Sequence, residues 1–141
     1  MIRMRLDDIA VSGEGKQFLL LLRADEDERI LPIVVDAMQA LAIAAGRSGE
    51  KSSRPLTHDL MLSLLEVLGA EVVQVEITDL IEGTFYSMLV IERGGVRFDI
   101  DARPSDALAV AVRVDAPILV AEEVLENSGL DDETSEGGFE A

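Results

Sequence analysis

The sequence predicts an α/β (α+β) fold in which a strand-strand-strand-helix unit is duplicated and one additional helix links the two copies. Three observations support this fold class. Several segments alternate apolar and polar residues with a period of two, which is typical of half-buried strands. Each half of the chain follows its strands with an alanine-rich helical segment, ALAIA at 40–44 and ALAVA at 107–111. A leucine-rich segment of helical period lies between the halves, at 57–68.

The first unit is expected over about residues 3–46. Glycine and charged residues mark the turns between its strands, and Asp36 is the type of residue that caps a helix N-terminus. Gly46 is expected to end the helix, because glycine readily adopts the left-handed conformation found there. The predicted elements are strands at 3–11, 16–23 and 30–35 and a helix at 37–45.

The second unit is expected over about residues 72–113. The segment 93–95 (RGG) is a hairpin signal, and Pro104 suits the first turn of a helix, where its missing amide hydrogen is not needed. Chance similarity between two amphipathic segments is the alternative to duplication. The predicted elements are strands at 72–80, 84–92 and 96–101 and a helix from Pro104 or Ser105 to Arg113.

The link between the units, 47–69, combines a polar loop with the helix at 57–68. Thr57 is expected to cap this helix and Gly69 to end it. Four of its apolar residues share one face at helical spacing: Leu60, Leu64, Leu65 and Leu68.

The chain is expected to form a single domain over residues 1–130. A short strand and a helix are predicted over 117–128, after the second unit. Residues 131–141 are acidic and contain glycine, and we expect them to be a disordered tail.

Two of the predicted helices, 37–45 and 107–112, are apolar nearly all round. A helix that covers a sheet in a small monomer normally keeps one polar face. These helices therefore need cover on two sides, and we expect a homodimer whose interface uses helices. The alternative is a helix layer that lies wholly inside one chain.

Composition limits the classes of function. The chain has 141 residues, no cysteine and a formal net charge of −16, from 12 basic and 28 acidic residues. The absence of cysteine excludes disulfides, thiolate metal sites and cysteine nucleophiles. The negative charge repels nucleic acid and anionic membranes at long range. No segment reaches the length of a membrane span, and the N-terminus lacks the apolar core of a signal peptide, so a cytoplasmic protein without membrane contact is expected.

Carboxylates gather near the end of the predicted strand 96–101. Period-two alternation puts Val96, Phe98 and Ile100 on a buried face and Arg97, Asp99 and Asp101 on a polar face. Together with Asp106 at the start of the next helix, Asp99 and Asp101 are candidate ligands of a hard cation. The alternative is structural: Asp101 and Ser105 cap the helix, and Arg103 pairs with a neighbouring carboxylate.

A second candidate is the locally basic loop that precedes the leucine-rich helix. Its cationic or titratable residues are Arg47, Lys51, Arg54 and His58. It leads into a helix N-terminus, where free amide groups favour anions, so it is a candidate phosphate site. A solvated loop is the alternative. His58 is the single histidine, which excludes a histidine-rich metal site within one chain, and no phosphate-binding glycine loop, dinucleotide-binding fingerprint or HExxH motif occurs.

Three segments, 54–60 (RPLTHDL), 83–86 (GTFY) and 99–107 (DIDARPSDA), resemble the bifunctional nuclease (BFN) domain family. The resemblance extends over roughly residues 3–127. It implies a duplicated α/β domain that forms dimers, with activity on DNA and RNA. The sequence departs from the pattern at Gln39-Ala40, where similar members often have Glu-Ala.

The resemblance and the residues lead to a metal-assisted nuclease acting on DNA or RNA as the first functional hypothesis. Asp101, Asp106 and His58 are the candidate catalytic residues, with His58 moving a proton. Asp99, Asp101 and Asp106 would hold Mg²⁺ or Mn²⁺, and Arg54, Arg103 and Ser105 would bind the substrate phosphate. The alternative is a non-enzymatic homodimeric binding or regulatory module whose polar corner is structural, and the net charge of −16 favours it.

Overall fold

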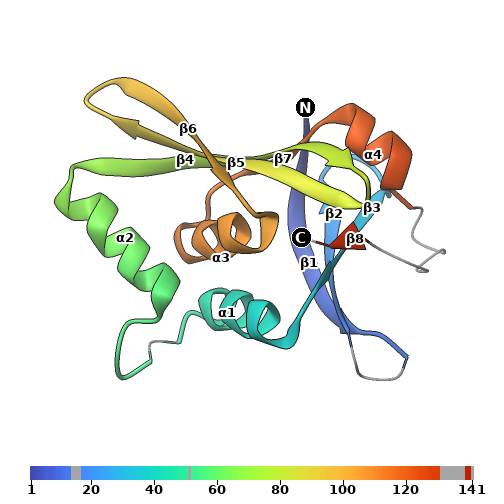
Figure 1. Ribbon diagram of the computed structural model, residues 1–141, viewed down its shortest axis with the longest axis horizontal. Coiled ribbons are helices and arrows are strands. Elements are labelled where there is room, and N and C mark those ends of the chain that lie inside the picture. Colours follow the sequence, from blue (N-terminus) through green and yellow to red (C-terminus); the bar gives the residue numbers. More distant parts are fainter. Residues whose placement is uncertain (14–16, 51, 131–138, 141) are drawn as a thin grey trace.

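The computed structural model describes residues 1–13, 17–50, 52–130 and 139–140. Three helices lie together on one side of a bent sheet, and the fourth lies apart from them near one end of the sheet (Figure 1). The helices are α1 (Ala37–Ser48), α2 (Thr57–Val67), α3 (Pro104–Val114) and α4 (Glu122–Ser128). The strands are β1 (Ile2–Val11), β2 (Phe18–Ala24), β3 (Ile30–Val35), β4 (Ala70–Ile81), β5 (Thr84–Arg93), β6 (Val96–Ala102), β7 (Ile118–Val120) and β8 (Phe139–Glu140).

The predicted α/β class and the order of elements in both units are confirmed. β1, β2 and β3 form one antiparallel meander that leads to α1, and β4, β5 and β6 form another that leads to α3. β7 joins the two meanders, because it pairs antiparallel with β1 and parallel with β4. β8 runs parallel to both β3 and β5. The origin of the two units in a duplication stays a prediction.

Helix α3 lies at the centre of the hydrophobic core. Its Leu108 and Ala109 pack in a cluster with β2, β3 and α1, and its Ala107, Val110 and Ala111 pack in a second cluster with β4, β5 and the inner side of α2. All five residues are buried within one chain. The expectation that this helix needs a second subunit for cover is therefore wrong. Helix α1 buries Ala40 and Ile43 but leaves Met38 and Leu41 exposed.

Two helix ends differ from the sequence prediction. α1 continues past Gly46 to Ser48 and ends at Gly49, whose φ of 73° is left-handed. The predicted Asp36 cap is confirmed, since its carboxylate accepts the Gln39 amide N–H. Thr57 is the first residue of α2 rather than its cap, because the N-cap position is Leu56 and the Asp59 carboxylate accepts the Leu56 N–H.

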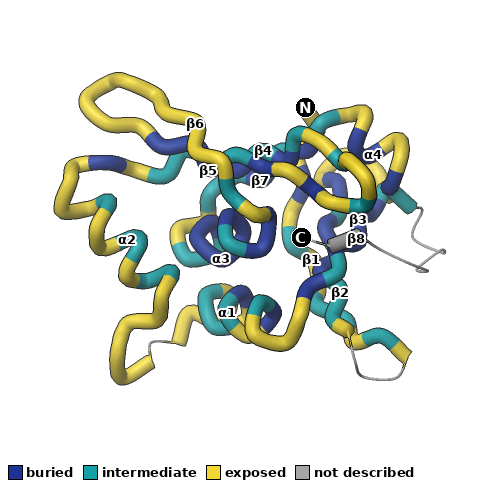
Figure 2. Tube along the Cα trace, viewed as in Figure 1, coloured by how far each residue is buried: buried dark blue, intermediate teal, exposed yellow. Residues whose placement is uncertain are grey.

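The outward face of α2 is apolar and unpartnered. We expected Leu60, Leu64, Leu65 and Leu68 to share a packing face, but only Leu65 packs against the core, together with Met61 and Leu62. Leu60, Leu64 and Leu68 are 54%, 54% and 58% exposed, and Val67 beside them is 84% exposed. No residue of α2 is buried, and Figure 2 shows this helix at the rim of the molecule.

Strand β6 is also exposed, although its apolar and polar residues alternate between the two faces of the sheet as predicted. Ile100 and Phe98 pair with Leu89 and Ile91 of β5, which belong to the core on the helix side of the sheet. Even so, Val96, Phe98 and Ile100 are 55%, 47% and 42% exposed. The prediction that they are buried is wrong, because β6 pairs only with β5 among the described strands and the β5–β6 hairpin projects away from the helices (Figure 1).

The C-terminal segment was predicted to be a disordered tail. Phe139 and Glu140 form β8 instead, and the rest of that prediction, 131–138 and 141, lies outside the described residues. Among the described helices, none combines the length and the apolar character that a bilayer crossing requires.

Candidate functional site

The first turns of α1, α2 and α3 meet around one pocket with a volume of about 570 Å³. Met38 and Gln39 come from the start of α1, Thr57 and His58 from the start of α2, and Asp106 from the start of α3. A helix N-terminus carries partial positive charge on its free amide groups. The pocket is thus a place where three such termini meet a histidine and a carboxylate.

His58, Asp106 and Arg103 form a continuous polar array in this pocket. His58 Nε2 lies 3.0 Å from Asp106 Oδ1, and Arg103 Nε donates to Asp106 Oδ2 over 2.9 Å. The His58 side chain is only 12% exposed and that of Asp106 35%. Burial raises the pKa of Asp106, but the hydrogen bonds from His58 and Arg103 outweigh it, and the pKa of Asp106 is lowered. The same bond to Asp106 raises the pKa of Arg103.

Ser105 and Gln39 connect α3 to α1 beside this array. Gln39 Nε2 donates to Ser105 Oγ over 3.1 Å, and Gln39 Oε1 accepts the Asp36 amide over 2.9 Å. Ser105 is the second residue of α3 and is 2% exposed, so it does not occupy the N-cap position as predicted. The N-cap position is Arg103, which makes no side-chain cap bond; Asp101 does not cap the helix either, whereas Pro104 opens it as predicted.

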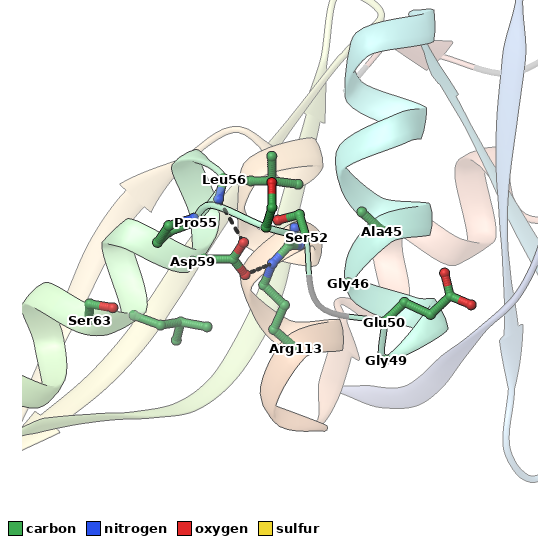
Figure 3. Close-up of a pocket in the computed structure, with 12 residues that line it drawn as sticks. Ala45, Gly46, Gly49, Glu50, Ser52, Pro55, Leu56, Asp59, Ser63 and Arg113 are labelled. Atoms are coloured by element: carbon green, nitrogen blue, oxygen red, sulfur yellow. Dashed lines mark hydrogen bonds and ion pairs between the residues drawn. The ribbon is translucent and has the colours of Figure 1, made fainter.

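Arg113 and Asp59 hold α2 in place against α3 (Figure 3). Arg113 Nε donates to Asp59 Oδ1 over 2.7 Å, and its Nη1 donates to the carbonyls of Ala42 in α1 and Ala109 in α3. A Cβ on Gly46 would lie 2.5 Å from Arg113 Nη1, so the glycine allows this close approach. Asp59 directly follows His58, and the ion pair therefore sets the position of the first turn of α2.

The predicted metal ligands are not brought together. Asp99 and Asp101 lie on one face of β6, together with Arg97, and pair with Val90 and Met88 of β5. Arg97 Nη2 lies 3.5 Å from Glu76 Oε2 on the same face. Residues of β6 that face α3 alternate with them, so both carboxylates point away from the helix that carries Asp106. Within the described ranges, no group of three or more His, Cys, Asp or Glu side chains is arranged to hold a metal ion.

Of the cationic or titratable residues of the basic loop that the structure describes, His58 alone lines the pocket. Arg47 Nη2 donates to the Asp7 carbonyl over 2.7 Å, away from the array. Arg54 is exposed and is not among the residues that line the pocket, and Lys51 lies outside the described residues. Sequence reasoning missed three features: the Gln39–Ser105 contact, the Asp59–Arg113 pair, and an apolar wall that includes Met38 and Leu41. Two features of the sequence touched these residues without predicting their contacts: the segment 54–60 (RPLTHDL), which contains Asp59, and the departure from the family pattern at Gln39.

Fold and site together define an α+β protein of two strand-strand-strand-helix units with a His-Asp-Arg array where three helices begin. The chain belongs to the bifunctional nuclease domain family, whose profile matches residues 20–133.

Two kinds of relative are found. An uncharacterized protein, MT1877, of Mycobacterium tuberculosis is 43% identical over 130 residues, which cover 92% of this chain and 77% of the relative. Bifunctional nuclease 1 of Oryza sativa subsp. indica is 28% identical over 115 residues, covering 79% of this chain and 35% of the plant protein. Bifunctional nuclease 2 of Arabidopsis thaliana is 27% identical with the same coverage.

Proposed function

We propose that this protein is a nuclease that cleaves phosphodiesters of DNA or RNA at the pocket formed by His58, Arg103 and Asp106. The observation that carries the proposal is the array itself: a histidine bonded to a carboxylate, with an arginine beside it, in a pocket at three helix N-termini. The relatives named bifunctional nuclease support the same reaction class. A cytoplasmic location is part of the proposal.

His58 is the proton carrier in this proposal. A carboxylate only accepts hydrogen bonds, so the His58–Asp106 contact requires the hydrogen on Nε2, which leaves Nδ1 as the basic nitrogen. Nδ1 takes a proton from the attacking water, the hydroxide oxygen bonds to phosphorus, and the bond to the leaving oxygen breaks. The imidazolium then returns the proton to that oxygen. Asp106 orients the ring.

Arg103 is the phosphate-binding residue. Its side chain is 65% exposed, and only its Nε is engaged, by Asp106, among the bonds of the described residues. Its terminal nitrogens can therefore meet two phosphate oxygens in the bidentate geometry that a guanidinium favours. A requirement for Mg²⁺ or Mn²⁺ stays a prediction. Because Asp99 and Asp101 face away from Asp106, the predicted donor set does not fit a metal, and no step is assigned to one.

Activity assays on His58→Gln test the proposal. We expect wild-type protein to cleave single-stranded DNA or RNA, and the variant to lose about 10²- to 10⁴-fold in rate, because a positioned acid-base group contributes that much. The assays are run with EDTA, with Mg²⁺ and with Mn²⁺. Protein freed of contaminating nucleases that cleaves nothing under any of these conditions would contradict the proposal, as would a folded variant of full activity.

A homodimeric binding or regulatory module is the second candidate, and the exposed apolar surface favours it. Leu60, Leu64, Val67 and Leu68 form one stripe on α2 at helical spacing. An unpartnered stripe of this kind marks an interaction surface. We propose that it pairs with a second copy of the chain.

Sedimentation velocity tests the homodimer. We expect wild-type protein to sediment as a dimer, and Leu64→Glu to sediment as a monomer, because the charge would have to be buried at the interface. Glu66→Lys, a change at an exposed polar position on the same helix but off the stripe, should leave the dimer intact. A monomeric wild type at tens of micromolar would overturn it.

A further inference from the structure

The pocket has two chemically different ends. His58, Arg103 and Asp106 form the polar end. The other end is a wall on α1 made by Met38, Leu41, Ala42 and Ala45, which lie at helical spacing on one side of that helix, with Leu56 across from them. Met38 and Leu41 are 75% and 64% exposed. Exposed apolar side chains on a soluble protein normally occur singly, so two of them side by side mark a contact surface.

The wall offers apolar contact area, and its own residues carry no side chain that can hydrogen-bond to a base edge. Gln39 is the one amide side chain among the described residues that line the pocket, and each end of its amide already makes one hydrogen bond, to Ser105 and to the Asp36 backbone. Ser105 is itself buried. A flat apolar group placed on Met38 and Leu41 would be held by area burial, and the wall residues themselves carry no N–H or O–H side chain that distinguishes one base edge from another. The Thr57 hydroxyl also lines the pocket, from the first turn of α2 beside His58 at the polar end.

We propose that the pocket binds one nucleotide unit of an unpaired strand, with its phosphate at Arg103 and His58 and its base on the Met38–Leu41 wall, without preference for base identity. This inference rests on the proposed function and names its substrate class. The volume of about 570 Å³ lies within the range of small-ligand pockets. A base in a duplex is stacked and paired, and must leave the stack to enter a pocket of this kind. Single-stranded nucleic acid is the substrate class that avoids this cost.

The net charge of −16 is consistent with such a mode of binding. Long-range repulsion opposes a duplex, which carries one phosphate charge per about 1.7 Å of helix axis, more than it opposes a flexible single strand that inserts one unit. With one arginine at the pocket, few counterions are released on binding. The logarithm of the binding constant should fall with the logarithm of salt with a slope of about −1 or shallower.

Binding of small probes tests the proposal without relying on cleavage. Inorganic phosphate, ribose 5-phosphate, AMP and UMP are titrated into the full chain, and amide and methyl NMR signals report the site. We expect both nucleotides to bind about tenfold more tightly than ribose 5-phosphate, since the base adds burial on the leucine and methionine. AMP and UMP should agree within about threefold, because the wall residues that the base contacts carry no polar side chain that reads its edge. A nucleotide that binds no better than ribose 5-phosphate would overturn the proposal.

Leu41→Gln and Leu64→Gln form a matched pair of variants, since both leucines are exposed on helices, at 64% and 54%. Leu41→Gln should remove the tenfold higher affinity for nucleotides over ribose 5-phosphate and leave phosphate binding unchanged. Leu64→Gln should keep that tenfold difference. If Leu41→Gln instead weakens self-association and leaves nucleotide binding intact, the wall is an interface between copies and the proposal fails. Equal affinity for a single-stranded and a duplex decamer would also overturn it.

Cleavage assays on the same samples separate this proposal from the proposed function. If nucleotides bind more tightly than ribose 5-phosphate but no substrate is cleaved, the nuclease proposal is refuted and the nucleotide pocket is supported. Cleavage that depends on His58 but shows no dependence on Leu41 supports the nuclease proposal and refutes the nucleotide pocket.

Discussion

Replacing Asp106 with asparagine should lower the rate of phosphodiester cleavage by about 10²- to 10⁴-fold, as expected when the carboxylate that orients a catalytic histidine is lost. The amide is nearly the same size, so the fold should survive. It cannot accept the His58 Nε2–H and the Arg103 Nε–H with two negatively charged oxygens, as the carboxylate does. The imidazole then loses the partner that fixes its tautomer and its orientation.

The matched control is Asp99→Asn. Asp99 is exposed on the face of β6 that points away from α3, so this change should leave the rate within about twofold of wild type. Under the metal hypothesis from the sequence, Asp99→Asn would remove a ligand and cost as much as Asp106→Asn. Steady-state rates at a fixed concentration of Mg²⁺, and again in EDTA, distinguish the two. A large loss in Asp99→Asn would contradict the arrangement derived from the structure.

The sequence predicted the strand, turn and helix that carry Asp99, Asp101 and Asp106, but not the contacts that these side chains make. Period two over 96–101 and the proline at 104 were sufficient to place a strand, a turn and a helix in this order. The decisive contact, His58 with Asp106, joins residues 48 positions apart, and no local pattern reports which helix starts meet. Alternation also put Asp99 and Asp101 correctly on one strand face. It could not tell that this face turns away from α3, because that depends on the side of the sheet on which the helices pack.

Leucine spacing on α2 illustrates a second limit. The chain carries two apolar stripes on this helix, and the stripe of Leu60, Leu64 and Leu68 is as regular as the one of Met61, Leu62 and Leu65 that packs inward. Periodicity identifies the helix but cannot rank the two faces when both are apolar. The capping error has another cause: α2 begins one residue earlier than predicted, so Thr57 is already helical and Leu56, which has no capping side chain, occupies the N-cap position.

Removing either partner of the Arg113–Asp59 ion pair should cost more stability than any surface change in this chain. Arg113 is 7% exposed and ties α1, α2 and α3 through Asp59, Ala42 and Ala109. Asp59→Ala leaves a buried guanidinium without its carboxylate, which costs about 3 kcal/mol of unfolding free energy. Arg113→Met leaves Asp59, which is 37% exposed and still bonded to the Leu56 amide, so we expect about 2 kcal/mol.

A double-mutant cycle measured by urea unfolding checks this expectation. The double variant should be less destabilised than the sum of the two single changes, by about 1–2 kcal/mol, because neither leaves a charge unpaired once both are gone. Arg29→Met is the control: Arg29 also pairs with two carboxylates, Asp27 and Glu122, but at the surface, so it should cost less than about 1 kcal/mol. Strict additivity at Arg113 and Asp59 would contradict a direct coupling.

The pH dependence of the unfolding free energy is an independent test of the Asp59–Arg113 ion pair. Hydrogen bonds from the Leu56 amide and from Arg113 lower the pKa of Asp59, despite opposition from burial. A carboxylate whose folded pKa lies below its unfolded value of about 3.9 stabilises the native state above that value. This contribution is lost as the pH falls through the folded pKa. Wild-type stability should therefore drop below about pH 4 more steeply than that of Asp59→Ala. Since Asp59 holds the first turn of α2, which carries His58, acid should also loosen the contact of His58 with Asp106.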